Sequence, residues 1–138
     1  MNDVDESGSN SKYTVKLMDD YVDVVWDGYI SQDMAAQCNT EVYEAAQKLI
    51  SQSKPLLLRL RTEHAPHKPN VDAFSEALKT LQTGLPFKRI VLWGPVPRLV
   101  HMLINLLLES YSTEFDIKYI EDEQAALHWL LTGETKLA

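Results

Sequence analysis

The chain has 138 residues, of which 45% are hydrophobic and 24% charged, and this length is typical of one domain with its own core. Its formal net charge of −7 argues against sequence-independent nucleic-acid binding, which needs a basic surface. The acidic N-terminus lacks the apolar run of a secretory signal, and every apolar stretch falls short of the ~20 residues that span a bilayer.

The residue pattern in the first part of the chain predicts a flexible tail, a hairpin and a helix. Residues 1–12 are rich in Asn, Asp, Ser and Gly, so we expect a flexible acidic tail. Apolar residues alternate over 13–18 and 21–26, and the two aspartates between them predict the turn of an antiparallel hairpin. Ser31 is placed to cap an amphipathic helix of about five turns.

We expect residues 13–138 to form one domain. After the first helix, the chain alternates strands with helices. The expected elements are, in order, 56–61, 70–84, 88–93, 97–110, 116–120 and 122–131. Strands that alternate with helices pair in parallel through right-handed crossovers. The expected fold class is therefore α/β, with a five-stranded, mostly parallel sheet, an antiparallel first edge strand and the order β-β-α-β-α-β-α-β-α.

Charged residues interrupt one face of the expected sheet. Every second residue of 22–26 and of 56–60 is apolar, which predicts one buried face. The charged residues of the other face are Lys16, Asp23, Arg59, Arg61 and Lys118. We expect the helices to pack mainly on the apolar face and to leave the other partly open. Pairing of Asp23 with Arg59 across neighbouring strands explains the charges equally well without a ligand.

The last third of the chain carries three segments that occur together in a known family. They are Phe87-Lys88-Arg89-Ile90-Val91-Leu92, Ile117-Lys118-Tyr119-Ile120 and Ala125-Ala126-Leu127-His128-Trp129-Leu130. With a long apolar helix between the first two, they resemble the SpoIIAA-like (STAS-like) family, and the layout agrees over about residues 13–132. The resemblance implies a single βα superhelix of four turns with helices mainly on one side of the sheet. It also implies a relation to CRAL-TRIO domains, in which such a sheet forms the floor of a lipid pocket.

Members of that family that act on anti-sigma factors carry a phosphorylated serine after the third strand. The corresponding segment here, 61–70, lacks an Asp-Ser-Ser-Gly pattern, and Thr62 is its only hydroxyl. The phosphorylation switch is therefore not carried over to this chain.

Motifs for catalysis are absent from the sequence. It contains no GxGxxG or GxxxxGK[ST] phosphate loop and no GxSxG nucleophile elbow. An enzyme of another type would need Asp27, His64 and Glu121 in one cleft. His64 and His67, with Glu63 beside them, can ligate a metal, but a solvated polar loop explains them more simply. We expect that the chain is not an enzyme and that it binds no cofactor and no metal.

The loop that follows the third strand lies where open α/β sheets usually receive ligands. The candidate ligand-binding residues are Asp27, Arg59, Arg61, Thr62, His64 and Trp93. An apolar or lipid-like small molecule on the open sheet face is the alternative function. Trp26, Trp93 and Trp129 are expected mainly as core anchors.

The segment 97–110 is more apolar than packing on one side of a sheet requires. Its polar residues, Arg98, His101, Asn105 and Glu109, recur at spacings of three and four and form one narrow stripe. The surplus apolar surface is buried either by neighbouring helices or by a partner. The candidate interface residues are Leu99, Val100, Leu103, Ile104 and Leu107. The leading hypothesis is a non-enzymatic interaction or regulatory domain that binds a protein partner or itself as a homodimer.

Cys38 is the only cysteine in the chain, so neither an internal disulfide nor a cysteine-based metal module can form. A reducing, cytoplasmic compartment is the simplest interpretation of this cysteine usage.

Overall fold

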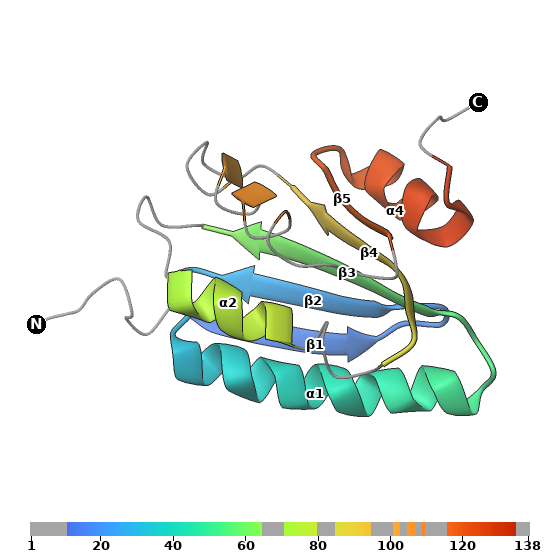
Figure 1. Cartoon of the computed structure of the whole chain (residues 1–138), viewed down its shortest axis with the longest axis horizontal. Helices are drawn as coiled ribbons and strands as arrows, with labels where there is room; N and C mark the ends of the chain where they lie inside the picture. Colours follow the sequence, from blue (N-terminus) through green and yellow to red (C-terminus); the bar gives the residue numbers. More distant parts are fainter. Residues whose placement is uncertain are drawn as a thin grey trace, which may run out of the picture.

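The computed structural model describes residues 11–64, 71–79, 85–94, 101–102, 105–106, 109 and 116–134. Its elements are β1 (Lys12–Leu17), β2 (Val22–Asp27), α1 (Gln32–Ser51), β3 (Leu56–Glu63), α2 (Val71–Lys79), β4 (Phe87–Trp93), β5 (Asp116–Ile120) and α4 (Glu123–Thr132). Figure 1 shows the strands side by side in one twisted sheet, with α1 along its lower edge. None of the described helices combines the length and the apolar content that a bilayer crossing requires.

The five strands lie in the order β1-β2-β3-β4-β5, so neighbours in the chain are neighbours in the sheet. β1 and β2 pair antiparallel, and the three remaining pairs are parallel. The expected α/β class and the antiparallel first edge strand are therefore confirmed. The sequence pattern did not predict the order of the strands in the sheet, and the structure supplies it.

The hairpin and α1 form for the local reasons that the sequence indicates. Lys12 pairs with Asp27, so β1 begins inside the stretch that was expected to be tail. Ser11 is also engaged, because its hydroxyl accepts a hydrogen bond from the Tyr29 amide at 3.2 Å. At the start of α1, the Ser31 hydroxyl accepts a hydrogen bond from the Met34 amide at 3.1 Å, as predicted.

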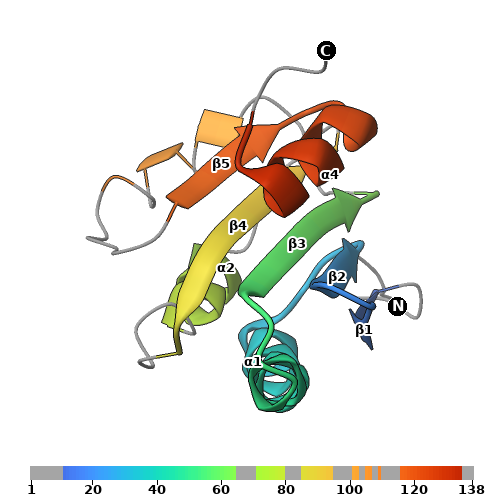
Figure 2. The ribbon, with the colours of Figure 1, turned by 90° about the vertical axis from the view of Figure 1, so that its right-hand side faces the viewer.

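The main core lies between the sheet and α1, with α2 beside α1 on the same face (Figure 2). Val22, Val24 and Trp26 point into this core from β2, and alternate leucines of β3 join them. A second, smaller core lies under α4 on the opposite face of the sheet, over β3, β4 and β5. The predicted bias of the helices toward one face is confirmed, as is the burial of all three tryptophans.

α4 is fixed at both ends by specific contacts. The Asp122 carboxylate accepts a hydrogen bond from the Ala125 amide at 2.8 Å, and Gly133 ends the helix in the left-handed conformation with φ +80°. The Arg89 guanidinium of β4 donates to the Leu130 carbonyl at 2.8 Å. A cation at this end of a helix is favourable because the last carbonyls carry partial negative charge. These contacts place α4 on one half of the sheet, while Thr14 and Lys16 on the same face of β1 are exposed.

Candidate functional site

The candidate ligand-binding residues lie at the carboxyl ends of β2, β3 and β4. Parallel pairing places Asp27 opposite Glu63 and Arg61 opposite Trp93. Side chains alternate along a strand, so Asp27, Arg59, Arg61 and Trp93 share the sheet face on which α4 packs. Thr62 points to the other face, where its register partner is Trp26. We call the four residues on the shared face, together with His64, the strand-end cluster.

Arg59 is the buried centre of the strand-end cluster, with only 8% of its surface exposed. Its Nε donates to the Asp23 carboxylate at 2.9 Å, and Glu123 of α4 lies 3.9 Å from its Nη1. Its guanidinium carbon is 5.3 Å from the centre of the Tyr21 ring and 5.1 Å from that of Trp93. The predicted pairing of Asp23 with Arg59 is confirmed. Tyr21 and Glu123 come from distant segments and were not predicted as partners of Arg59.

Arg61 and Trp93 form the outer part of the cluster. The Arg61 side chain is 35% exposed, and its Nη1 lies 3.4 Å from a Glu63 carboxylate oxygen. Its guanidinium carbon lies 5.3 Å from the Trp93 ring centre, within the range of a cation–π contact. The buried Trp93 Nε1 has no hydrogen-bond partner among the residues that the structure describes. Because this atom is inaccessible to solvent, a ligand would reach it only after a rearrangement.

His64 and Asp27 form a hydrogen-bonded pair beside this cluster. The His64 Nδ1 lies 2.7 Å from the Asp27 carboxylate, and this hydrogen bond raises the pKa of His64 above its usual 6.5. His64 adopts a left-handed backbone conformation with φ +51°, and the Gly28 amide donates to the Glu63 carbonyl at 2.8 Å. The ends of β2 and β3 are therefore tied together by one side-chain and one backbone contact.

The strand order separates the three residues that an unrecognised enzyme would need. Asp27 ends β2, His64 follows β3 and Glu121 follows β5. Strands lie about 4.8 Å apart, so Asp27 and Glu121 are separated by roughly 14 Å across the sheet. The described residues also contain no group of three potential metal ligands, and His67 lies outside them. The strand ends therefore bring Asp27 and His64 together and leave Glu121 apart from them.

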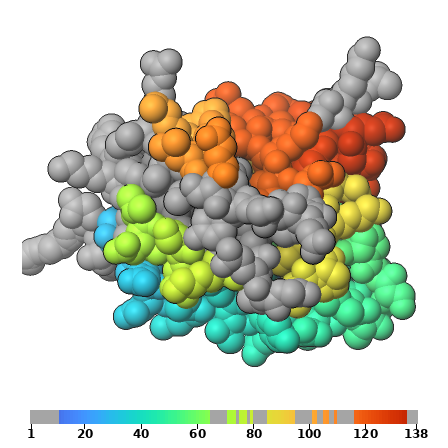
Figure 3. Space-filling model, viewed as in Figure 1, coloured from blue at the N-terminus to red at the C-terminus, as the bar shows by residue number. Residues whose placement is uncertain are grey.

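The second candidate surface is the predicted helix 97–110, of which the structure describes five residues, all of them helical. The predicted interface residues Leu99, Val100, Leu103, Ile104 and Leu107 all lie outside the described residues. The ring centre of His101 lies 4.3 Å from that of Tyr119 in β5. Tyr119 is aligned with Leu92, so the register places this contact on the same face of the sheet as α1 and α2. Figure 3 shows the described part of this segment (light orange) at the surface beside β5.

Four described residues of this segment are exposed: Met102, Asn105, Leu106 and Glu109. Their spacing of three and four residues places them on one side of a helix, and we call this side the outer face. Met102 and Leu106 are 55% and 60% exposed, the largest values among the described large hydrophobic residues. The sequence interpretation did not select these two residues as an interface. They border the polar stripe of Asn105 and Glu109, which is the signal that would have indicated their exposure.

Comparisons with known proteins identify the fold. No protein-family model matches the chain, and no curated protein sequence matches it. A solved structure does match: an uncharacterised protein from the DUF3478 family of Shewanella loihica PV-4, described as having a SpoIIAA-like fold. The TM-score is 0.57, with 18% sequence identity over 90% of this chain and 98% of that chain. The chain has a SpoIIAA-like fold.

At 18% identity the likeness shows the SpoIIAA-like fold alone. The resemblance that the last third of the sequence indicated is therefore confirmed for the fold, and the relation to CRAL-TRIO domains stays a prediction. Within the SpoIIAA-like fold, the two candidate surfaces lie on opposite faces of the sheet. The strand-end cluster lies on the α4 side, and the outer face belongs to the helix that contacts Tyr119.

Proposed function

We propose that this chain is a non-enzymatic interaction domain that binds another protein, or a second copy of itself, through the outer face. The observation that carries the proposal is the exposure of Met102 and Leu106, two long apolar side chains one helical turn apart. Single exposed apolar residues are ordinary on protein surfaces, but adjacent ones form a continuous patch that a partner can cover.

The free energy that a partner gains by covering Met102 and Leu106 follows from the exposed fractions of these two side chains. Complete burial of a leucine or methionine side chain is worth about 1.5–3 kcal/mol. Met102 and Leu106 each keep more than half of their surface exposed, so covering both yields roughly 2–3 kcal/mol. This is too little to offset the cost of association alone, so a partner needs further contacts. Asn105 and Glu109 border the two apolar residues and supply the polar rim that such interfaces have.

A lipid-like ligand on the sheet face is less well supported by the geometry. The strand-end cluster is lined by charges that already pair with one another, Arg59 with Asp23 and Arg61 with Glu63. An apolar molecule on this face would remove water from these groups without replacing its hydrogen bonds, which is unfavourable.

Sedimentation velocity and affinity capture test the proposed function together. The variant carries Met102→Gln and Leu106→Gln, and the control carries Tyr43→Gln on α1, where the side chain is 46% exposed. We expect the wild-type and control chains to self-associate with concentration or to retain a specific protein. We expect the double variant to lose that association while its unfolding curve changes little, because both sites are exposed. Association that the double variant retains in full, or that none of the chains shows, contradicts the proposal.

A further inference from the structure

We infer that the outer face binds a cationic amphipathic helix of a different protein rather than a second copy of this chain. This inference rests on the proposed function and names the class of partner. It depends on the charges that surround Met102 and Leu106, together with the helical spacing of those two residues.

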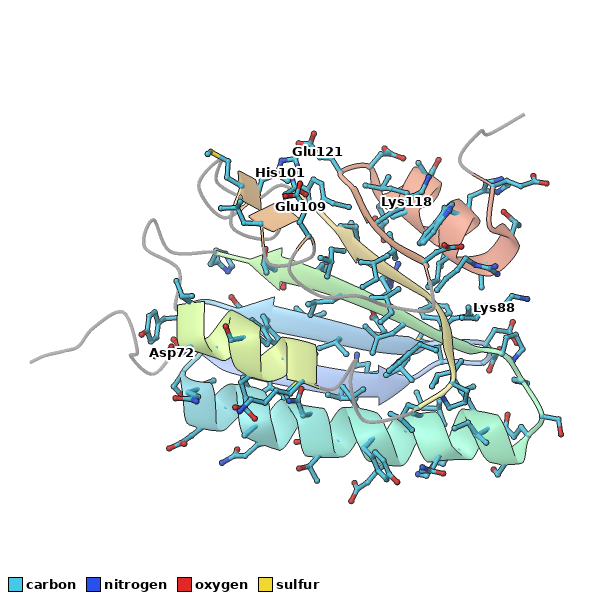
Figure 4. All side chains as sticks on the ribbon, viewed as in Figure 1. Asp72, Lys88, His101, Glu109, Lys118 and Glu121 are labelled. Atoms are coloured by element: carbon cyan, nitrogen blue, oxygen red, sulfur yellow. The ribbon has the colours of Figure 1, made fainter. Side chains whose placement is uncertain are left out.

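Acidic side chains border the apolar residues of the outer face. Glu109 lies on the outer face itself, and Glu121 follows β5, two residues after the tyrosine that contacts His101. In the view of Figure 4, His101, Glu109 and Glu121 project onto the same region beside β5. Both carboxylates are exposed, and neither has an ion-pair partner among the residues that the structure describes.

The same charges disfavour a second copy as the occupant. A symmetric dimer brings the same patch of both subunits together, so the Glu109 and Glu121 carboxylates of both copies would lie in or beside one interface. Each chain also carries a net charge of −7. Like charges brought together across an interface oppose association, whereas lysine or arginine at the same positions favours it.

The shape of the apolar surface favours a helix over a flat surface. Met102 and Leu106 are separated by four residues, so their side chains form one ridge along the helix. A partner helix with apolar residues at the same spacing can pack along this ridge. Amphipathic helices that bind in this way present apolar anchors at spacings of three, four and seven residues. Basic residues beside the anchors then lie close to Glu109 and Glu121.

The inference is tested with two synthetic peptides and the full-length chain. Both peptides are amphipathic helices of about 18 residues, long enough to hold helical structure. They carry leucine on one face and differ only in having lysine or glutamate on the other. Binding is measured by fluorescence anisotropy at low salt and at about 1 M salt, where the Debye length is about 3 Å. Sedimentation velocity on the chain without peptide is recorded in parallel.

We expect the lysine peptide to bind, and its affinity to fall at high salt. Leu106→Gln should weaken binding by about tenfold, since the variant removes a buried apolar contact. Glu109→Gln with Glu121→Gln should weaken it roughly two- to tenfold and reduce its salt dependence. The matched control is Tyr43→Gln with Glu44→Gln on α1, an exposed aromatic residue beside an exposed carboxylate. This control should leave the affinity unchanged.

Three outcomes overturn the inference. Equal binding of the glutamate peptide shows that charge does not select the partner, and an equal loss in the α1 control shows unspecific attraction to an acidic protein. A dimer that dissociates on Leu106→Gln overturns the class of partner but leaves the proposed function standing. Failure of the proposed function itself is distinct, because then neither peptide binding nor self-association responds to Leu106→Gln.

Discussion

Removal of the Asp23 carboxylate should destabilise the fold more than removal of any exposed charge. The Arg59 and Asp23 side chains are 10% and 14% exposed and lie 2.9 Å apart. Breaking a buried ion pair by deleting one partner typically costs about 3–5 kcal/mol, because the other charge stays buried. Arg59 retains a long contact to Glu123 and the faces of two aromatic rings. We therefore expect Asp23→Ala to lower the free energy of unfolding by about 2–3 kcal/mol.

Urea unfolding measures this effect, with a second pair as control. Lys79 and Glu76 lie 3.1 Å apart on α2, and the Lys79 side chain is 62% exposed. Lys79→Ala should change the free energy of unfolding by no more than about 0.5 kcal/mol. Replacement of both Asp23 and Arg59 by apolar residues should recover much of the loss, because no unpaired charge then remains buried. An Asp23→Ala loss as small as that of Lys79→Ala would contradict the assignment of Asp23 and Arg59 as a stabilising buried ion pair.

Three further predictions follow from individual contacts. Leu130→Ala, in the fully buried centre of the core under α4, should lower the free energy of unfolding by about 2–5 kcal/mol in urea titrations; a loss below about 1 kcal/mol contradicts that packing. The pKa of His64, measured by NMR, should lie above 6.5 and fall toward 6.5 in Asp27→Asn, because their hydrogen bond favours the protonated ring. That pair should therefore stabilise the fold below about pH 6.5 and lose its contribution as the pH rises through the raised pKa; the reverse trend would contradict the contact. Burial raises the pKa of the Cys38 thiol to about 11, so a thiol reagent at pH 8 should react only on unfolding; rapid labelling of the native protein would show that Cys38 is exposed.

Local sequence patterns predicted the order of the described strands along the chain and the faces of the sheet, but β1 begins at Lys12 in the expected tail and β3 extends to Glu63, beyond its expected end at Arg61. Alternation over 22–26 and 56–60 places apolar residues on the face that α1 covers. Ser31 and Asp122 begin their helices because each presents a side-chain oxygen to a backbone amide that has no partner within the helix. These features depend on residues a few positions apart. The chain order of the elements therefore followed directly from the sequence.

Contacts between distant segments were predicted less completely. Asp23 and Arg59 were paired correctly because parallel neighbouring strands align them. The contacts of Arg59 with Glu123 and Trp93 depend on where α4 and β4 pack, which no local pattern specifies. The sequence placed Asp27 and His64 among the candidates, but their hydrogen bond requires the turn that His64 makes with φ +51°.

The outer face shows the same limit of sequence reasoning. Helical periodicity gave the polar stripe correctly for Asn105 and Glu109, which are exposed. His101 belongs to the same stripe, yet its ring contacts Tyr119 of β5. The orientation of the helix on the sheet decides which bordering residues are exposed, and local periodicity does not specify that orientation. Met102 and Leu106 are exposed as a consequence.

A two-dimensional NMR titration of the isotopically labelled chain with the lysine peptide locates the binding surface residue by residue. We expect the shifted amides to cluster at Met102, Leu106, Glu109 and Glu121, with Tyr43 on α1 unaffected. Shifts spread over α1 and the strand-end cluster, or none at peptide concentrations that saturate the anisotropy signal, would contradict the assignment of the outer face as the binding surface.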